Sequence, residues 1–218
     1  MIKNTTTYRT HLTLILLGHV LLAASALAAA PDEPAGTGNV SATQSTRILV
    51  AYYSMTGNTQ RMAVAVAEGA RRVDGTEVVV KKVDEISKED LAAADGIVLG
   101  APTYFANMPG KMKTAIDDWN WKMKVDFTDK VGGAFATGGG QMGGKEQTVV
   151  SLLLFMINNR MVVAGPLYSD AEGEDKWAEV GAGAMTGPLD PGVGDAEIDS
   201  AHRLGQRIAR LAKKMAVR

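Results

Sequence analysis

The stretch RILVAYYSMTGNTQRM, residues 47–62, joins an apolar run, a polar turn and the start of an amphipathic segment. Arg47–Tyr53 is short and almost continuously apolar, which is typical of a strand buried on both faces. From Asn58 to Val73, apolar residues recur at helical spacing, and Asp74-Gly75 ends the segment. A strand that turns directly into a helix indicates the first unit of a parallel α/β sheet.

The alternation of strand and helix continues along the chain. Further strands are predicted at 77–83, 96–102, 131–136 and 161–164, and helices at 58–73, 87–94, 108–119, 147–158 and 198–215. Ser87 with Asp90 three residues later resembles a capping box at the start of the second helix. The order predicts an α/β fold with a five-stranded parallel sheet and helices on both faces.

The first 45 residues differ in composition from the rest. Residues 1–28 begin with Lys3 and Arg9, continue as an apolar run and end in Ala26-Leu27-Ala28, small residues at signal-peptidase spacing. They predict a cleaved secretory signal and an exported, periplasmic protein. An uncleaved anchor is the alternative, because the run is near the length that spans a bilayer. The small, polar residues 29–45 predict a linker, and 46–218 a single domain.

The composition excludes several function classes. The chain has 218 residues, a formal net charge of −1, three histidines and no cysteine. Thiol nucleophiles are therefore excluded, and no metal site is predicted, because only His202 lies beyond the predicted signal. His202 itself is predicted to be a solvated helix residue. The absence of a basic face argues against nucleic acid as a partner.

Three loops follow the first, third and fourth predicted strands, where such folds bind ligands. They are Ser54–Thr59, Pro102–Pro109 and Thr137–Gly144, and all are poor in charge and rich in glycine, hydroxyl or amide groups. In the first loop, Gly57 allows close approach to the backbone N–H groups at a helix start, and four hydroxyl or amide side chains add donors. This predicts a phosphate site without Lys or Arg. A plain helix N-cap is the alternative.

Two other glycine-rich stretches give weaker signals. Gly139–Glu146 nearly spells a nucleotide P-loop, but Glu146 stands where the motif needs Ser or Thr after the lysine. Gly181–Gly187 resembles a dinucleotide fingerprint with one residue too many and no predicted strand before it. We interpret it as a loop.

The three loops together resemble those of a known family. Ser54–Thr59 resembles the FMN-phosphate loop of flavodoxins. Pro102–Met108, and Thr137–Gly140 followed by Glu146–Thr148, look like the isoalloxazine loops of the tryptophan-repressor-binding-protein family. These are FMN-dependent NAD(P)H:quinone oxidoreductases, and the resemblance runs from about Arg47 to Lys214. It implies a flavodoxin-like fold, FMN as cofactor, NAD(P)H as electron donor, a quinone or similar small molecule as acceptor, and a homo-oligomer, either dimer or tetramer.

The resemblance also implies roles for single residues. The expected FMN-binding residues are Ser54, Met55, Thr56, Gly57, Asn58 and Thr59 at the phosphate, Pro102, Thr103, Tyr104, Phe105, Ala106 and Asn107 along the ring, and Thr137, Gly138, Gly139 and Gly140 at its pyrimidine edge. Trp119 or Trp121 would stack on the substrate, with core packing as the alternative. Asn158 is a third catalytic candidate, because Asn158-Asn159 stand where the family has histidines. Thr56 replaces a family aromatic, and the family's insertion after the second strand is missing.

Two other functions stay open. One is a flavodoxin-type electron carrier without a substrate of its own, and the other is a flavin-free binding module. The predicted flavin loops contain no acid before Glu146, which favours two-electron chemistry over the low potential of a carrier. Export would separate the protein from cytoplasmic NAD(P)H, so a membrane redox partner or a quinol is a further hypothesis for the donor. The segment Gln147–Asn158 is more apolar than one buried stripe requires, which favours a dimer or a larger assembly.

Overall fold

The computed structural model describes residues 45–140, 142–167, 180–187 and 192–216, all within one unit of the chain, residues 41–218. The predicted signal and nearly all of the predicted linker lie outside the described residues. The elements are β1 (Thr46–Tyr52), α1 (Asn58–Arg71), β2 (Thr76–Lys82), α2 (Lys88–Ala93), β3 (Gly96–Pro102), α3 (Gly110–Trp121), β4 (Val131–Gly138), α4 (Lys145–Asn158), β5 (Val162–Val163), β6 (Ala182–Met185) and α5 (Asp195–Ala216).

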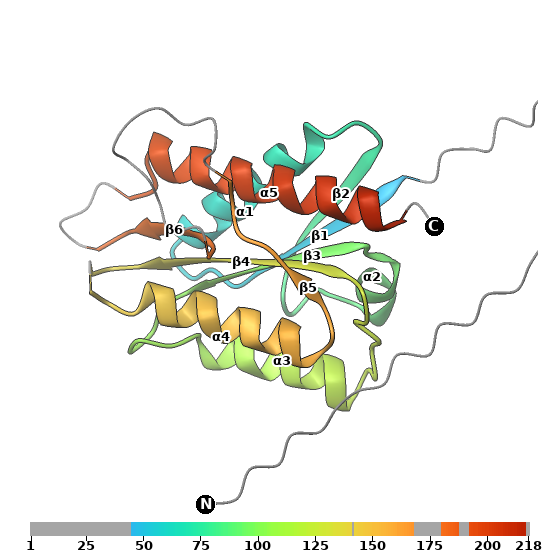
Figure 1. Ribbon diagram of the computed structural model, residues 1–218. Coiled ribbons are helices and arrows are strands. Elements are labelled where there is room, and N and C mark those ends of the chain that lie inside the picture. Colours follow the sequence, from blue (N-terminus) through green and yellow to red (C-terminus); the bar gives the residue numbers. More distant parts are fainter. Residues whose placement is uncertain (1–44, 141, 168–179, 188–191, 217–218) are drawn as a thin grey trace, which may run out of the picture. The chain divides into compact units, whose positions relative to one another are not determined.

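The strands form one parallel sheet in the order β2-β1-β3-β4-β5, and β6 also pairs with β4. Figure 1 shows α1 and α5 on one face of the sheet and α3 and α4 on the other. Each face has its own hydrophobic core, one under α1 and α5 and one under α2, α3 and α4. The predicted doubly wound α/β fold is confirmed. No helix in the described part of the chain has the length and apolar character that a membrane span needs.

The fifth strand is divided into two pieces. β5 pairs with Val131 and Gly132 at the start of β4, whereas β6 pairs with Phe135–Gly138 at its end. The interpretation of Gly181–Gly187 as a loop was therefore wrong. Gly181 lies so close to β4 that a Cβ would approach the Ala134 carbonyl oxygen to 2.6 Å. The small residues glycine and alanine in this segment allow β6 to lie against β4. Both residues have a low β-propensity, so the sequence pattern did not predict a strand here.

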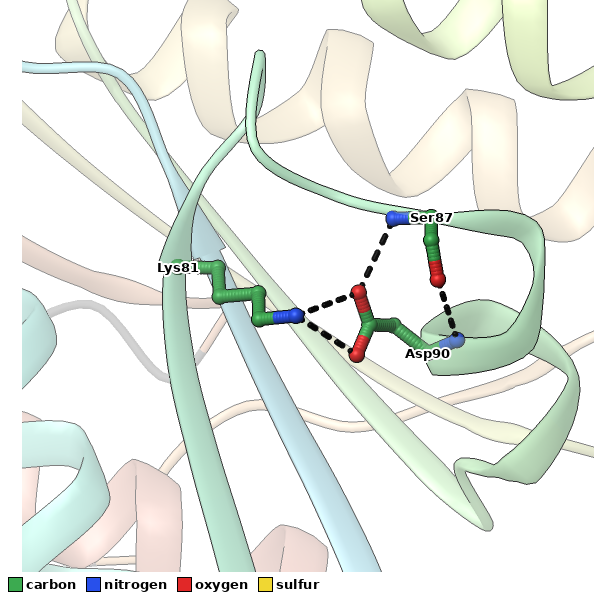
Figure 2. A network of polar contacts seen from close by, with 3 residues as sticks. All are labelled: Lys81, Ser87 and Asp90. Atoms are coloured by element: carbon green, nitrogen blue, oxygen red, sulfur yellow. Dashed lines mark hydrogen bonds and ion pairs between the residues drawn. The ribbon is translucent and has the colours of Figure 1, made fainter.

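The predicted capping box at α2 is confirmed. The Ser87 hydroxyl accepts a hydrogen bond from the Asp90 N–H at 3.2 Å, and the Asp90 carboxylate accepts one from the Ser87 N–H at 2.9 Å. The Lys81 ammonium on β2 donates to both carboxylate oxygens of Asp90, at 2.8 and 2.7 Å (Figure 2). This network anchors the short helix α2 to the neighbouring strand.

Helices α1 and α5 pack closely through two glycines. A Cβ at Gly69 would overlap the backbone carbonyl of His202, and one at Gly205 would overlap that of Val66. The prediction of His202 as a solvated residue was wrong, because its side chain is only 15 % exposed. Its ring nitrogens contact Glu68 at 3.0 Å and Arg72 at 3.1 Å on α1.

Candidate functional site

A pocket of about 110 Å³ opens between the loops that follow β1, β3 and β4. These strands are neighbours in the sheet, so their carboxyl ends meet at one edge. The lining residues are Met55, Thr56, Thr59, Pro102, Thr103, Tyr104, Thr137, Gly138, Gly139 and Thr186. All of them except Thr186 are among the residues that the sequence assigned to the site.

The first loop leaves the N-terminus of α1 without a side-chain cap. Gly57 has a φ of 94°, in the left-handed region that favours glycine, and a Cβ there would meet nothing within 4 Å. The Ser54 hydroxyl accepts a hydrogen bond from the Gly57 N–H at 3.1 Å and so stabilises the turn itself. Among the described residues, no side-chain hydrogen bond caps the helix, so the alternative of a plain N-cap was wrong. The first N–H groups of α1 present the positive end of the helix dipole to an anion.

A buried hydroxyl pair forms the floor of the pocket. The Thr59 and Thr137 hydroxyl oxygens lie 2.8 Å apart, and both residues are only 2 % exposed. The pair joins the start of α1 to the end of β4. Because a hydroxyl can both donate and accept, either group can turn toward a ligand while keeping its bond to the other.

Two more threonines were not among the residues assigned to the site from the sequence: Thr186 lines the pocket, and Thr148 lies behind it and contacts the lining residue Thr103. Thr148 on α4 shares a hydrogen bond with the Thr103 hydroxyl at 2.9 Å and is fully buried. The Thr186 N–H donates to the Gly138 carbonyl at 2.7 Å. Thr148 gave a usable signal, because it is a hydroxyl in the first turn of the helix that directly follows the third loop. Thr186 gave none, since β6 was not predicted.

The second loop contains a strained turn. Tyr104 and Asn107 exchange backbone hydrogen bonds of 2.8 and 3.1 Å, and between them Phe105 and Ala106 have φ values of 51° and 62°. Positive φ at both central positions is normally met by Asn and Gly, and costs other residues roughly 1–2 kcal/mol each. The Phe105 side chain is fully exposed beside the pocket. Such strain is found most often at binding sites.

Tyrosines and a methionine form one wall of the pocket. The Tyr104 hydroxyl donates to the Met55 sulfur at 3.7 Å, and its ring meets that of Tyr53 edge-on, with centroids 6.4 Å apart. Burial, with a smaller effect of Tyr53, raises the pKa of Tyr104 above its ordinary value. The phenol therefore stays protonated and remains a hydrogen-bond donor at neutral pH.

The third loop is held close to its neighbours. A Cβ at Gly138 would lie 2.8 Å from the Lys145 side chain, and one at Gly144 would lie 2.7 Å from Ala106. The Lys145 ammonium donates to the Gly140 carbonyl at 2.8 Å, which keeps a positive charge beside the loop. Met142 is almost completely exposed at the loop's outer side.

The three catalytic candidates do not line this pocket. Trp119 is 1 % exposed and packs edge-on against Phe155, with centroids 6.5 Å apart. Trp121 is 75 % exposed, with the Lys124 ammonium 5.6 Å from its ring centroid. Helices α3 and α4 begin at the pocket and run back for 12 and 14 residues, about 18–21 Å. Trp119, Trp121 and Asn158 therefore lie near the opposite edge of the sheet from the pocket of their own chain.

A larger cavity, of about 540 Å³, lies between α3 and the segment after β2. Its walls are mainly apolar, and the charged groups at it, Asp84, Lys111 and Asp118, have mixed signs. It lacks the converging loops and hydroxyls of the smaller pocket, so we assign the site by chemistry and not by size. Within the described ranges, no group of three or more His, Asp or Glu could hold a metal ion.

Comparison with known proteins gives relatives of two kinds. The model of the NADPH-dependent FMN reductase family matches residues 73–175. A flavodoxin of Aquifex aeolicus is 37 % identical over 163 residues, which covers 75 % of this chain and 85 % of that protein. An NAD(P)H dehydrogenase (quinone) of Syntrophobacter fumaroxidans is 31 % identical over 202 residues, which covers 78 % of this chain and 98 % of that protein.

Solved structures agree with the fold. A WrbA-like flavodoxin of Agrobacterium tumefaciens has a TM-score of 0.59 and 26 % identity, and the match covers 78 % of this chain and 99 % of that one. An archaeal flavodoxin has a TM-score of 0.60 at 22 % identity, covers 77 % of this chain and 99 % of its own, and bears on the fold alone.

Proposed function

The chain belongs to the flavodoxin-like family that includes these NAD(P)H dehydrogenases (quinone), and we propose on that premise that it is an FMN-dependent oxidoreductase. It passes two electrons from NAD(P)H or another donor to a quinone. The observation that carries the proposal is the uncapped N-terminus of α1 beside the buried pair of Thr59 and Thr137. Hydroxyls and free N–H groups at a helix start suit a phosphate group.

The residues present fit FMN. The phosphate would be held by Ser54–Thr59, and the ring edge by the second and third loops. The enclosed volume of about 110 Å³ is smaller than the roughly 300–1,000 Å³ of a typical ligand pocket. Part of the ligand would therefore lie outside it, against the exposed side chains of Met55, Phe105 and Met142. Bound FMN supplies the hydride chemistry, and the protein supplies its orientation and electrostatics.

The charges around the pocket favour two-electron reduction. Among the described residues that line it there is no Asp or Glu. The ammonium of Lys145 is held at the third loop by the Gly140 carbonyl. Negative charge that develops on a bound ring would therefore meet a lysine and neutral donors. Tyr104, kept protonated by burial, adds a hydroxyl donor at the same wall.

The visible spectrum of the full chain with added FMN is the direct test. We expect flavin bands that sharpen on binding and bleach under anaerobic NADH, and that return when a quinone is added. A colourless protein that ignores FMN would instead support a flavin-free binding module. Flavin bands that respond to neither NADH nor a quinol would contradict the oxidoreductase.

An electron carrier is the second candidate, because one relative at 37 % identity is named a flavodoxin. A redox titration separates the two functions. A single two-electron step supports the oxidoreductase. Two well-separated one-electron steps would support the carrier.

We also propose that residues 1–28 are a cleaved secretory signal, that 29–45 are a linker, and that the protein acts in the periplasm. The support is the basic start, the apolar run and Ala26-Leu27-Ala28. A membrane redox partner or quinol would then replace cytoplasmic NAD(P)H as donor. Mass spectrometry of protein from cell fractions tests this. A periplasmic chain that begins at Ala29 is expected, and an intact Met1 in the cytoplasm would contradict export.

A further inference from the structure

Methionine carries all the sulfur of this protein. The chain has 11 methionines and no cysteine. Met62, Met112 and Met156 are fully buried, whereas Met55 is 70 % and Met142 is 99 % exposed. Of the methionines that the structure describes, these two are the ones most open to a reagent in solution. Both belong to loops that carry the candidate site.

The surroundings of Met55 differ from those of Met142. Met55 lines the pocket, and its sulfur accepts a hydrogen bond from the Tyr104 hydroxyl at 3.7 Å. This contact joins the first pocket loop to the second. Because burial raises the pKa of Tyr104, the hydroxyl keeps its proton and remains a donor at neutral pH. A thioether sulfur is a weak acceptor, so a stronger acceptor at the same place would tighten the contact.

We propose that Met55 is a site of reversible oxidation by peroxide, and that its sulfoxide lowers the affinity of the pocket for FMN. In the reaction, a lone pair of the sulfur attacks one oxygen of hydrogen peroxide, and the O–O bond breaks. An S–O bond forms, and the other oxygen leaves as water with both protons. The sulfur loses two electrons, and the peroxide gains them. Methionine sulfoxide reductases return the thioether.

The sulfoxide would change one wall of the pocket. Its oxygen is a stronger acceptor than the thioether and is bonded to the sulfur that already contacts Tyr104, so the two loops would be joined more firmly. It also turns an apolar side chain into a polar one, which weakens contacts with an apolar surface. The effect on FMN rests on the proposed function, whereas the oxidation of Met55 does not.

The hydrogen bond from Tyr104 also gives the oxidation a preferred direction. A thioether sulfur has two lone pairs, and oxygen added at one or the other gives a different epimer of the sulfoxide. The hydroxyl engages one lone pair, so peroxide should attack the other. A neutral hydrogen bond of modest strength implies an excess of one epimer at Met55 of about three- to tenfold. At Met142, which is exposed on the outer side of its loop, the two epimers should form almost equally.

Peptide mass spectrometry after mild treatment with hydrogen peroxide tests the modification without FMN. Met55 should be oxidised well before the buried Met62. After digestion, the two classes of methionine sulfoxide reductase, each specific for one epimer, should repair Met55 to unequal extents. Tyr104→Phe removes the hydroxyl, so both classes should repair its Met55 equally. Oxidation of Met55 no faster than that of Met62, or equal repair of Met55 in the wild type, overturns the proposal.

Flavin-fluorescence titration before and after oxidation tests the effect on the ligand. Peroxide should weaken FMN binding by the wild type about tenfold, because a polar oxygen would have to be desolvated against the ring, and the two reductases together should restore it. Met55→Leu has a similar side-chain volume and no sulfur at this position. It should keep after peroxide the affinity that it had before.

Met142→Leu is the matched variant, because it removes the other exposed sulfur and keeps Met55. It should lose affinity after peroxide as the wild type does. An equal loss in Met55→Leu and in the wild type overturns the proposal. A protein that binds no FMN before oxidation would contradict the proposed function and with it the effect on the pocket, while the unequal repair of the two epimers still decides the modification itself.

Discussion

At the scale of single residues, the hydroxyl pair of Thr59 and Thr137 is the most specific feature of the site. Both side chains are buried at the carboxyl edge of the sheet, and each is the hydrogen-bond partner of the other. A pair with this role only in folding could be replaced by two apolar residues at little cost. A pair that also serves a ligand could not.

Thr59→Val should lower FMN affinity about tenfold, because a hydrogen bond to a charged group is worth about 1.5–3 kcal/mol and a factor of ten in affinity is about 1.4 kcal/mol. Quenching of flavin fluorescence during titration measures the effect. Thr76→Val is the matched control, since the Thr76 hydroxyl is buried on β2 without a hydrogen-bond partner. The control should bind FMN like the wild type. Equal affinity for both variants would remove Thr59 from the ligand site.

Asp90 joins the capping box of α2 to an ion pair with Lys81, so we expect its charge to contribute to stability. Hydrogen bonds from Lys81, first, and from the Ser87 backbone hold the pKa of Asp90 below its ordinary value (Figure 2). A carboxyl whose pKa is lower in the folded state stabilises the fold above its unfolded pKa, about 3.9. That stabilisation is lost as the pH falls through the folded pKa.

Asp90→Asn should therefore lower the free energy of unfolding by about 1–2 kcal/mol near neutral pH, through loss of the capping box and the ion pair. The difference from the wild type should shrink as the pH falls below about 4, where the carboxyl in the unfolded chain becomes protonated first, and it should be lost as the pH passes through the lower pKa of the folded state. Urea unfolding at pH 7 and at pH 3–4 measures both. Asp117→Asn breaks an exposed pair with Lys113 and should change stability by less than about 0.5 kcal/mol. A difference that stays constant with pH would contradict the role of the Asp90 charge.

At the scale of elements, the contact between α1 and α5 depends on the glycines that let the two backbones approach. Gly205→Ala would place a methyl group against the Val66 carbonyl, where the rigid backbone cannot yield. Overpacking of this kind costs about 1–3 kcal/mol. For a domain of this size, this corresponds to a fall in Tm of several degrees.

Gly110→Ala is the control for Gly205→Ala. Gly110 lies at the first position of α3, where a Cβ meets nothing within 4 Å. The added methyl group should leave the Tm unchanged or raise it slightly. Thermal unfolding followed by circular dichroism compares the two variants. A Gly205→Ala protein as stable as the wild type would mean that α1 and α5 separate easily.

The elements also show how far the sequence alone could lead. Long runs with a clear period, such as β1 with α1 and the helix α5, were predicted close to their observed bounds. Strand β6 was missed because AGAM has no β-branched or aromatic residue and becomes a strand only through its contact with β4. The local sequence pattern also gave no sign that a segment this far after β5 pairs with the same strand, β4.

Some features of the candidate site were likewise predictable from the sequence, and others were not. The three loops were found because the topology brings the carboxyl ends of neighbouring strands together, whatever the side chains. The placement of Trp119 and Asn158 required knowledge of helix direction and length, since α3 and α4 carry both residues away from the pocket. Thr186 required β6. Local sequence thus predicted the backbone frame of the site better than the side chains that complete it.

At the scale of the whole molecule, the pocket is shared by segments that meet only in the folded state. Thr59 and Thr103 follow β1 and β3, Thr137 lies near the end of β4, and Thr186 follows β6. A ligand that binds there stabilises the native state, by about 2.7 kcal/mol at a concentration one hundred times its Kd. The shift in Tm therefore reports how much of the ligand the assembled loops hold.

The comparison of FMN with riboflavin tests which part of the ligand the first loop holds, since the two differ only in the phosphate. FMN should raise the Tm by several degrees, and riboflavin at equal concentration by clearly less, because only the phosphate can use the free N–H groups of α1. Gly57→Ala should reduce the FMN shift toward that of riboflavin, since a side chain is strained at a φ of 94°. Inorganic phosphate alone should compete with FMN and not with riboflavin. Equal shifts for both flavins would mean that the Ser54–Thr59 loop takes no part in binding, and the phosphate site would have to be sought elsewhere on the protein.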